Sequence, residues 1–266
     1  MTPMDMSTEE LFRDDATLLQ CTATVVAVDA TGIVLDRTVF YPLGGGQAGD
    51  TGTLTTASGT ALAAVLTITD TRKHKGLPGA IAHVPAAGAD LSAFTPGTVV
   101  TAQVHAARRQ AHRRFHTATH LLCALVPHPV DGCSITETYA RLDFHTAEPL
   151  DKEVLTAGIA RLVAGAHAVS HRWISEAELD ANPQLVRSMS VQPPRGLGRV
   201  RVLNIEGVDL QPCGGTHVGN TAEVGAVIVT KIEKKSAMTR RVVLGFADSA
   251  AQRDQASSHG TGSAGP

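Results

Sequence analysis

The sequence predicts an α+β fold in which a small N-terminal β-barrel precedes a domain of mixed helices and strands. Two observations carry this prediction. Short runs rich in β-branched residues, separated by glycine and proline, fill roughly the first hundred residues, a spacing typical of a small barrel or curled sheet. From residue 106 onward, apolar residues recur at helical spacing and alternate with further strand-like runs.

The predicted barrel domain occupies residues 1–105. Ser7 and Thr8 are common N-cap residues and predict a short helix ending near Leu19. Residues 21–28 and 33–35 have the small and β-branched side chains of strands, and the turn-forming residues between them predict a β-hairpin. Four more strands are expected in this domain, at residues 53–56, 63–69, 80–84 and 98–105.

A glycine-rich loop lies within this domain, with Gly44, Gly45, Gly46 and Gln47 at its centre. Glycines accept positive φ angles and leave backbone N–H groups accessible, which makes the loop a candidate cradle for phosphate or for the sugar-phosphate end of a nucleic acid. A tight corner of the barrel would need the same glycines without any ligand, and this alternative stays open.

Residues 107–125 predict the central helix of the chain. Its apolar residues follow alternating steps of four and three, which gives one stripe to bury, made of Ala107, Ala111, Phe115, Ala118, Leu122 and Leu125. A second stripe with the same spacing contains Arg109, Arg113, His116 and His120. His116 and His120 lie one turn apart, so their ring nitrogens can converge on a single ion.

A second group of metal-ligand residues follows much later, on a Gly-Gly loop. Cys213 and His217 are again four residues apart, and cysteine with histidine is the ligand set that zinc prefers. Four protein ligands would close the site and make it structural, whereas three would leave one position open for chemistry. The alternative is a buried core cysteine beside a loop histidine. No glutamate separates His116 from His120, which disfavours a zinc peptidase.

The rest of the second domain alternates helices and strands. Asp151 is expected to cap a helix whose buried stripe runs through Leu155, Ile159, Leu162, Ala166 and Val169, and Ser175 with Glu178 forms a capping box for another helix. Strands are predicted at 139–144 and 199–205, and a closing hairpin at 224–232 and 241–246. Residues 249–266 are rich in serine, glycine and alanine, which predicts a disordered tail.

Charge and cysteine content limit the functional classes. The 23 basic and 25 acidic side chains give a net charge of −2, so the chain as a whole carries no nucleic-acid signal. Basic residues instead gather at 108–114 and 231–241, which favours local contact with a nucleic acid, although a solvated face would look the same. Four scattered cysteines, no hydrophobic signal region and no membrane-spanning run make the cytoplasm the expected compartment.

The two ligand pairs resemble the HxxxH and CxxxH signature of the alanyl-tRNA editing family. This family comprises the editing domain of alanyl-tRNA synthetase and the free-standing AlaX proteins. Residues 41–52 resemble the glycine motif of the longer AlaX proteins, although Ala48 stands where the family usually has proline. The resemblance implies a two-layer α/β editing domain with an antiparallel sheet at 106–248. It also implies one Zn²⁺ per chain, held by His116, His120, Cys213 and His217.

The resemblance further implies a trans-editing hydrolase, a zinc-dependent aminoacyl-tRNA deacylase acting on the acceptor end of mischarged tRNA(Ala). Ser-tRNA(Ala) is the main expected substrate and Gly-tRNA(Ala) a second one. We expect no synthetase catalytic domain ahead of the motifs. Thr119 and Thr216 are candidates for the pocket that recognises the serine hydroxyl. The glycine loop, Arg109 and Arg113 are candidate contacts to the tRNA.

Two other functions are compatible with the same residues. The first is a non-catalytic RNA-binding module stapled by zinc, and the second is a zinc-dependent editor of another aminoacyl-tRNA. A deacylation assay on a panel of mischarged tRNAs separates all three.

Overall fold

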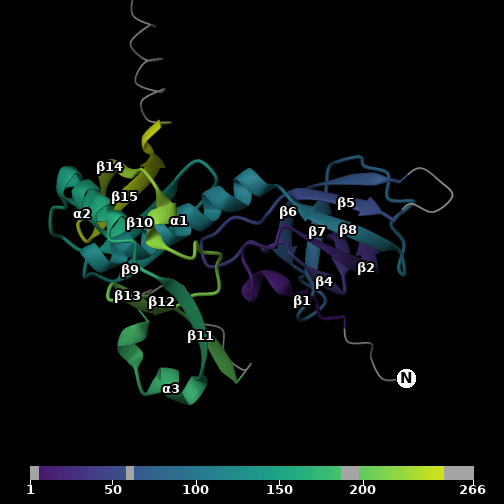
Figure 1. Ribbon diagram of the computed structural model, residues 1–266, viewed down its shortest axis with the longest axis horizontal. Coiled ribbons are helices and arrows are strands. Elements are labelled where there is room, and N and C mark those ends of the chain that lie inside the picture. The colour runs from purple at the N-terminus through teal and green to yellow at the C-terminus, as the bar shows by residue number, and fades with distance from the viewer. Residues whose placement is uncertain (1–5, 58–62, 187–197, 249–266) are drawn as a thin grey trace, which may run out of the picture. The chain divides into compact units, whose positions relative to one another are not determined.

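The computed structural model of the protein describes residues 6–57, 63–186 and 198–248 (Figure 1). The chain divides into two compact units, unit 1 (Met1–Arg113) and unit 2 (Arg114–Pro266). The boundary falls inside helix α1 (Ala106–Leu125). The protein is a mixed α/β structure with antiparallel sheets, as the sequence predicts.

Unit 1 is built on a closed barrel of six strands in the order β2-β3-β7-β6-β5-β8, and every neighbouring pair is antiparallel. Alternate side chains fill its interior, among them Val25, Leu35, Leu54, Ile68 and Val100, all buried. The strands are β2 (Gln20–Asp29), β3 (Gly32–Leu35), β5 (Gly52–Thr56), β6 (Val65–Lys73), β7 (Ile81–Pro85) and β8 (Val99–Val104).

The predicted β2–β3 hairpin is confirmed. Its turn needs glycine at position 32, because φ is +137° there and a Cβ would collide with the carbonyl of His83. The helix expected to end near Leu19 is wrong, since only a 3-10 turn forms at Leu11–Arg13. Thr8 does not cap a helix: its hydroxyl donates to the Leu35 carbonyl, and the next residues form β1 (Glu9–Glu10), which pairs with β4 (Arg37–Thr38).

Unit 2 contains a four-stranded antiparallel sheet in the order β14-β15-β10-β9. Its strands are β9 (Val130–Ile135), β10 (Ala140–His145), β14 (Val227–Ser236) and β15 (Thr239–Phe246). One face packs against α1 and α2 (Lys152–Ala164), with Phe115 and Leu122 of α1 and Ile159 of α2 in the same core as the sheet. This core buries the apolar stripe of α1 from Phe115 onward.

A smaller sheet of unit 2 has the order β11-β12-β13, and the short helix α3 (Glu176–Asp180) packs against it. Its strands are β11 (Val169–Ser175), β12 (Arg199–Ile205) and β13 (Asp209–Pro212). Val200 and Val202 of β12 pack with Leu179 of α3 on one face, whereas Leu203 and Ile205 belong to the main core. β13 delivers the chain to the loop that starts at Cys213.

Several predictions for unit 2 are confirmed. Asp151 caps α2 by accepting a hydrogen bond from the Val154 amide (2.9 Å), and Ser175 caps α3 by accepting one from the Glu178 amide (3.0 Å). The strand at 199–205 and the closing hairpin also form. The closing hairpin is two strands of the larger sheet.

Helix α2 is shorter than its predicted stripe. It ends at Ala164, Gly165 is its C-cap, and Ala166 takes a φ of 48°, so Val169 begins strand β11 instead of extending the helix. Strands β9, β11 and β13 were not predicted. The tail at 249–266 lies outside the described residues. Within the described part of the chain, no helix is long and apolar enough to cross a lipid bilayer.

Candidate metal centre

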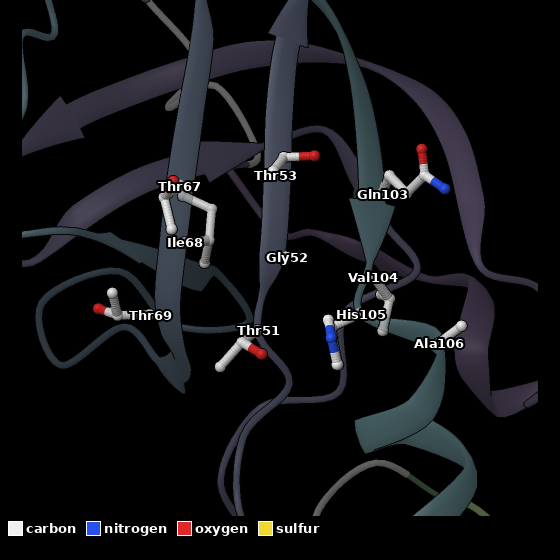
Figure 2. Close-up of a pocket in the computed structure, with 10 residues that line it drawn as sticks. All are labelled: Thr51, Gly52, Thr53, Thr67, Ile68, Thr69, Gln103, Val104, His105 and Ala106. Carbon is white, nitrogen blue, oxygen red and sulfur yellow. The ribbon is translucent and has the colours of Figure 1, made fainter.

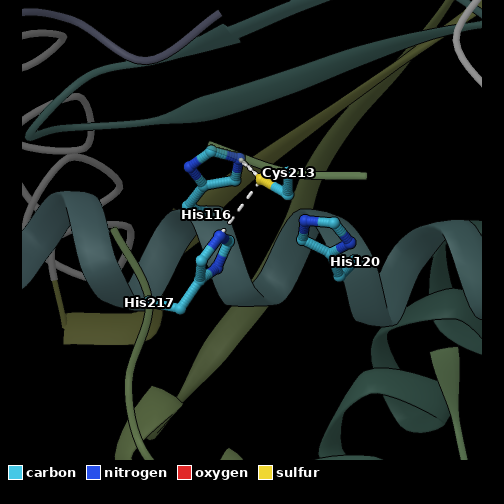
Figure 3. Close-up of side chains that lie close together, drawn as sticks. All are labelled: His116, His120, Cys213 and His217. Atoms are coloured by element: carbon cyan, nitrogen blue, oxygen red, sulfur yellow. Dashed lines mark hydrogen bonds between the residues drawn. The ribbon is translucent and has the colours of Figure 1, made fainter. Parts of the chain in front are cut away.

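His116, His120, Cys213 and His217 come together within unit 2. The first two lie on consecutive turns of α1, and the other two on the loop that follows β13 (Figure 3). One donor atom from each residue lies within 4.8 Å of all the others. The Cys213 Sγ lies 3.4 Å from His116 Nε2 and 3.2 Å from His217 Nε2.

Both halves of the cluster follow from local structure. The helix places residues four apart on one side, and His116 and His120 have ring centroids 5.6 Å apart. The loop is held by Arg201 of β12: the Cys213 amide donates to the Arg201 carbonyl (3.0 Å), and the Arg201 guanidinium donates to the carbonyls of Cys213 (2.9 Å) and Gly215 (3.2 Å). The buried arginine thereby fixes where the loop presents its two ligands.

The donor set fits a tetrahedral zinc ion. With Zn–S and Zn–N bonds of about 2.3 and 2.05 Å, tetrahedral ligands are separated by roughly 3.4 to 3.6 Å. The distances from the Cys213 Sγ to His116 Nε2 and His217 Nε2, 3.4 and 3.2 Å, lie at and slightly below the lower end of that range. A set of one thiolate and three imidazoles also suits zinc better than magnesium or calcium. The four residues could therefore hold one metal ion.

The electrostatics of the cluster favour the metal-binding protonation states of Cys213 and His217, whereas His120 would have to lose a proton to bind a metal. Burial alone would raise the pKa of the Cys213 thiol, but His116 and His217 hold it well below its usual range, which favours the thiolate. Burial keeps the pKa of His217 well below its usual value, so this ring is neutral. Burial would also lower the pKa of His120, but hydrogen bonds to Asp209 and Cys213 outweigh it and raise that pKa to about 10.

Asp209 and Thr117 contact the second ring nitrogen of two of the histidines. The Nδ1 of His120 lies 2.8 Å from Oδ2 of Asp209, and the Gln211 side-chain amide donates to both oxygens of that carboxylate (3.0 and 2.9 Å). The Thr117 hydroxyl lies 3.5 Å from Nδ1 of His217. Such partners fix the ring orientation and the tautomer of a histidine ligand.

Sequence reasoning missed Asp209, Gln211, Thr117 and Arg201. One signal was available for Asp209, which is a carboxylate four residues before Cys213 in a segment otherwise short of acids. Arg201 carried no such signal, because a basic residue in a strand is most often solvent-exposed.

The two threonines proposed for substrate recognition are both buried, Thr119 at 4% exposure and Thr216 at 0%. The Thr119 hydroxyl donates to the His116 carbonyl one turn earlier (2.7 Å). In this position the hydroxyl is already committed to the helix backbone, and its contact with a substrate stays a prediction.

The glycine loop of unit 1 forms a tight turn. The amides and carbonyls of Gly44 and Gln47 bond to each other (3.1 and 3.0 Å), while Gly45 and Gly46 take φ angles of +57° and +86°. Two positive φ angles in a two-residue loop define a type I′ turn. The amides of Gly44 and Gln47 point into the turn, so Gly45 and Gly46 form the tip that a ligand could approach.

Arg109 and Arg113, the proposed phosphate contacts, are both buried in unit 1. Arg109 is 1% exposed, and its guanidinium donates to the carboxylate of Asp50 and to the carbonyls of Val39 and Ala16. Arg113 is 8% exposed and donates to the side-chain oxygen of Gln110 (2.9 Å). The burial of Arg109 weighs against direct contact with phosphate and indicates a structural role.

Unit 1 also has an open pocket of about 620 Å³ on the outside of the barrel (Figure 2). It is lined by residues of β5, β6 and β8 and by the start of α1, including Thr53, Thr67, Thr69, Gln103 and His105. Its lining is mostly uncharged, and His105 is its one titratable side chain, so it offers little to a metal ion.

Two families match different parts of the chain. Residues 6–108 match the model of the family "tRNA synthetases class II (A)". Residues 200–243, which include the loop ligands, match that of the "Threonyl and Alanyl tRNA synthetase second additional domain". Fold and site thus define a relative of the tRNA synthetases with a candidate metal centre in its second unit.

Individual relatives are more specific. The chain is 32% identical over 249 residues to the alanyl-tRNA editing protein AlaX-M of Methanosarcina barkeri, covering 91% of this chain and 100% of that protein. It is 30% identical over 254 residues to AlaX-M of Methanosarcina mazei, covering 91% and 98%. The chain belongs to the family of alanyl-tRNA editing proteins.

The chain also resembles part of a larger enzyme. It is 32% identical over 233 residues to the alanine–tRNA ligase of Prochlorococcus marinus, which covers 81% of this chain but 24% of that ligase. The chain thus spans about a quarter of the length of this relative.

Proposed function

We propose that the protein is a trans-editing hydrolase that removes a wrong amino acid, chiefly serine and also glycine, from mischarged tRNA(Ala). The observation that carries the proposal is the largely buried Cys-His₃ cluster, in a chain that aligns over 91% of its length with an alanyl-tRNA editing protein. Membership of the family supports a tRNA(Ala) substrate, and the cluster is the candidate site.

We assign one zinc ion to His116, His120, Cys213 and His217. When bound, the ion would polarise the ester carbonyl or hold the aminoacyl group in place. Asp209 would keep the Nε2 lone pair of His120 directed at the ion, and Arg201 would keep the Cys213 loop in register with α1. These two residues act on the ligands and not on the substrate.

Rejection of the correct alanyl ester depends on one hydroxyl group. A pocket that hydrogen-bonds the serine hydroxyl leaves its own polar groups unpaired when alanine binds, which can discriminate by about 10⁴-fold. Thr119 and Thr216 are the candidates for this contact because both flank a ligand. We assign the tip of the glycine loop, Gly45 and Gly46, to the RNA end.

The test is a deacylation assay with Ser-tRNA(Ala), Gly-tRNA(Ala), Ala-tRNA(Ala) and one mischarged tRNA of another specificity. We expect rapid hydrolysis of the first two, and His116→Ala should abolish it. An exposed acid far from the cluster in the chain, Glu153 of α2, supplies the matched control as Glu153→Ala. Hydrolysis of only the non-alanine tRNA would instead identify an editor of another tRNA.

A non-catalytic role is the second candidate, and one observation favours it. All four donors converge within 4.8 Å, and four protein ligands around zinc are typical of structural sites. If the metal-loaded protein binds tRNA(Ala) but hydrolyses none of the four substrates, the zinc-stapled RNA-binding module is the correct description.

A further inference from the structure

The smaller sheet of unit 2 carries one aromatic and two arginine side chains next to the loop that starts at Cys213. Trp173 of β11 pairs in register with Arg201 of β12, so the two side chains lie on the same face of the sheet. The guanidinium of Arg199, two residues before Arg201, lies 4.5 Å from the centroid of the Trp173 ring. These three residues are the Trp173 platform.

This face of the sheet is continuous with the metal centre. Side chains alternate along β12, so Leu203 and Ile205 lie on the same face as Arg201, and both are buried in the main core. On β13, Gln211 and Asp209 pair with those two residues. The face therefore runs from the buried carboxylate that supports His120 to a half-buried tryptophan.

Arg201 links the platform directly to the cluster. Its guanidinium donates to the carbonyl of the ligand Cys213 (2.9 Å), while its strand neighbour is Trp173. Paired residues on adjacent strands have Cβ atoms roughly 5 Å apart, so the Trp173 side chain lies next to the residue that holds the loop after β13.

We propose that the Trp173 platform binds the single-stranded 3′ end of the RNA whose ester enters the metal centre. The proposal rests on the function proposed above. Aromatic rings and arginine planes stack on unpaired bases, and positive charge follows the phosphate backbone. Arg199 is exposed and supplies the charge, Trp173 supplies the π surface, and Arg201 ties both to the ligand loop.

The opposite face of the same strands lacks these features. There, Ile174 and Val202 pack under α3, and Arg172 forms an ion pair with Glu178 (2.9 Å). Arg172 is thus an exposed arginine one residue from Trp173 but on the other face, which makes it the matched control. A purely structural role for Arg199 and Trp173, a cation–π pair that stiffens the hairpin, predicts no effect on RNA binding.

The experiment uses the intact, metal-loaded protein and an RNA hairpin with a four-nucleotide 3′ overhang that ends in CCA and carries no amino acid. Trp173 is the single tryptophan of the chain, so its emission reports this surface alone. We expect saturable quenching by the hairpin and none by the same hairpin with a blunt end. Binding of dye-labelled RNA to the variants is followed by anisotropy.

Trp173→Ala should weaken binding about tenfold to hundredfold, as expected for one lost stacking contact, whereas Trp173→Phe should lose less. Arg199→Ala should reduce the salt slope by about 0.7 per lost phosphate contact, and Arg172→Ala should not change it. If Trp173→Ala fails to fold, Trp173→Phe and Arg199→Ala carry the test.

Unchanged Trp173 emission, or wild-type affinity in Arg199→Ala and Trp173→Phe together, would overturn the platform. Because this RNA carries no aminoacyl ester, these results do not depend on hydrolysis. If the hairpin quenches Trp173 emission as expected but the protein deacylates no mischarged tRNA, the platform is supported and the proposed editing activity is wrong. If the protein deacylates mischarged tRNA but the hairpin does not quench the emission, only the platform is wrong.

Discussion

The Nδ1 of His120 and the Oδ2 of Asp209 lie 2.8 Å apart in the interior of unit 2. This contact turns the other ring nitrogen of His120 toward Cys213 and the two remaining histidines. It joins β13 to α1 by a side-chain pair, with Gln211 holding the carboxylate in place.

Asp209→Asn is expected to lower metal affinity about tenfold to hundredfold, because the amide no longer fixes the His120 tautomer as a carboxylate does. Competition with a coloured chelator measures the affinity. The control is Glu206→Gln, the same loss of charge at an exposed position of the β12–β13 turn. Equal affinities in both variants would show that Asp209 does not support the site.

Purified protein is expected to hold about one zinc per chain, because one donor atom from each of the four residues lies within 4.8 Å of the others. His116→Ala should lose both the metal and part of the thermal stability, since the ion joins α1 to the loop after β13. Metal analysis with a parallel melting curve checks both effects. Less than about a tenth of an equivalent, without recovery on reconstitution, contradicts the assignment.

Acid should destabilise unit 1 through His83. Its buried ring lies 2.8 Å from the Thr38 hydroxyl and 3.0 Å from the Ile33 carbonyl, and burial lowers its pKa from 6.5 to about 4. The folded state therefore binds fewer protons than the unfolded state. The stability is complete above pH 6.5 and falls as the pH drops toward 4, by roughly 2 kcal/mol at pH 5.

Urea unfolding at pH 7.5 and pH 5 measures this effect, with His83→Gln as the comparison. The variant should be less stable at neutral pH but should lose less stability on acidification. The same pH dependence in both proteins would mean that His83 is not the group responsible.

Arg109→Met should lower the free energy of unfolding by about 3 to 5 kcal/mol, because it removes the guanidinium from the fully buried carboxylate of Asp50 and leaves only the Tyr41 amide and His112 beside it. Arg37→Met removes an exposed ion pair to Glu9 and should cost less than about 1 kcal/mol. Denaturant titration compares the two. A nearly unchanged stability for Arg109→Met, with a weaker salt dependence of tRNA binding, would support Arg109 as a phosphate contact.

The glycine turn can be tested at Gly45, where φ is +57° but a side chain would have open space beyond the Tyr41 hydroxyl at 3.9 Å. Gly45→Asn should keep the turn, because asparagine tolerates this φ, and Gly45→Val should strain it by about 1 to 2 kcal/mol. If the tip contacts the RNA end, both variants should deacylate more slowly. Wild-type rates in a folded Gly45→Asn would make the loop a barrel corner only.

Regular periodicity explains which elements were predictable. The long α1 and the β2–β3 hairpin each follow one clear pattern, and the caps Asp151 and Ser175 act within three residues of themselves. Strand β9 contains Asp131 and Gly132 and shows no alternation, and its pairing with β10 is decided by tertiary contacts. The early end of α2 depends on the positive φ of Ala166, a conformation that an alanine in the sequence does not predict.

Each half of the cluster could be predicted because the geometry within each pair of residues is local, while the supporting contacts are not. His116 and His120 need only a helix, and Cys213 and His217 only a short loop. The partners of Asp209 and Arg201 lie on other elements, which sequence spacing alone does not bring together. The helical alignment of Arg109 with these residues did not reveal that its side chain is buried against Asp50 in unit 1.

His116 and Cys213 lie 97 positions apart in the chain, which has a consequence for how a metal ion at this site would be acquired in the cell. A ribosome adding about 5 to 20 residues per second needs roughly 5 to 20 s to pass from one ligand pair to the other. During that interval the nascent chain exposes two histidines that cannot yet form the complete site. A metal ion held by all four residues would therefore bind only after β12, β13 and the loop that follows them have been synthesised.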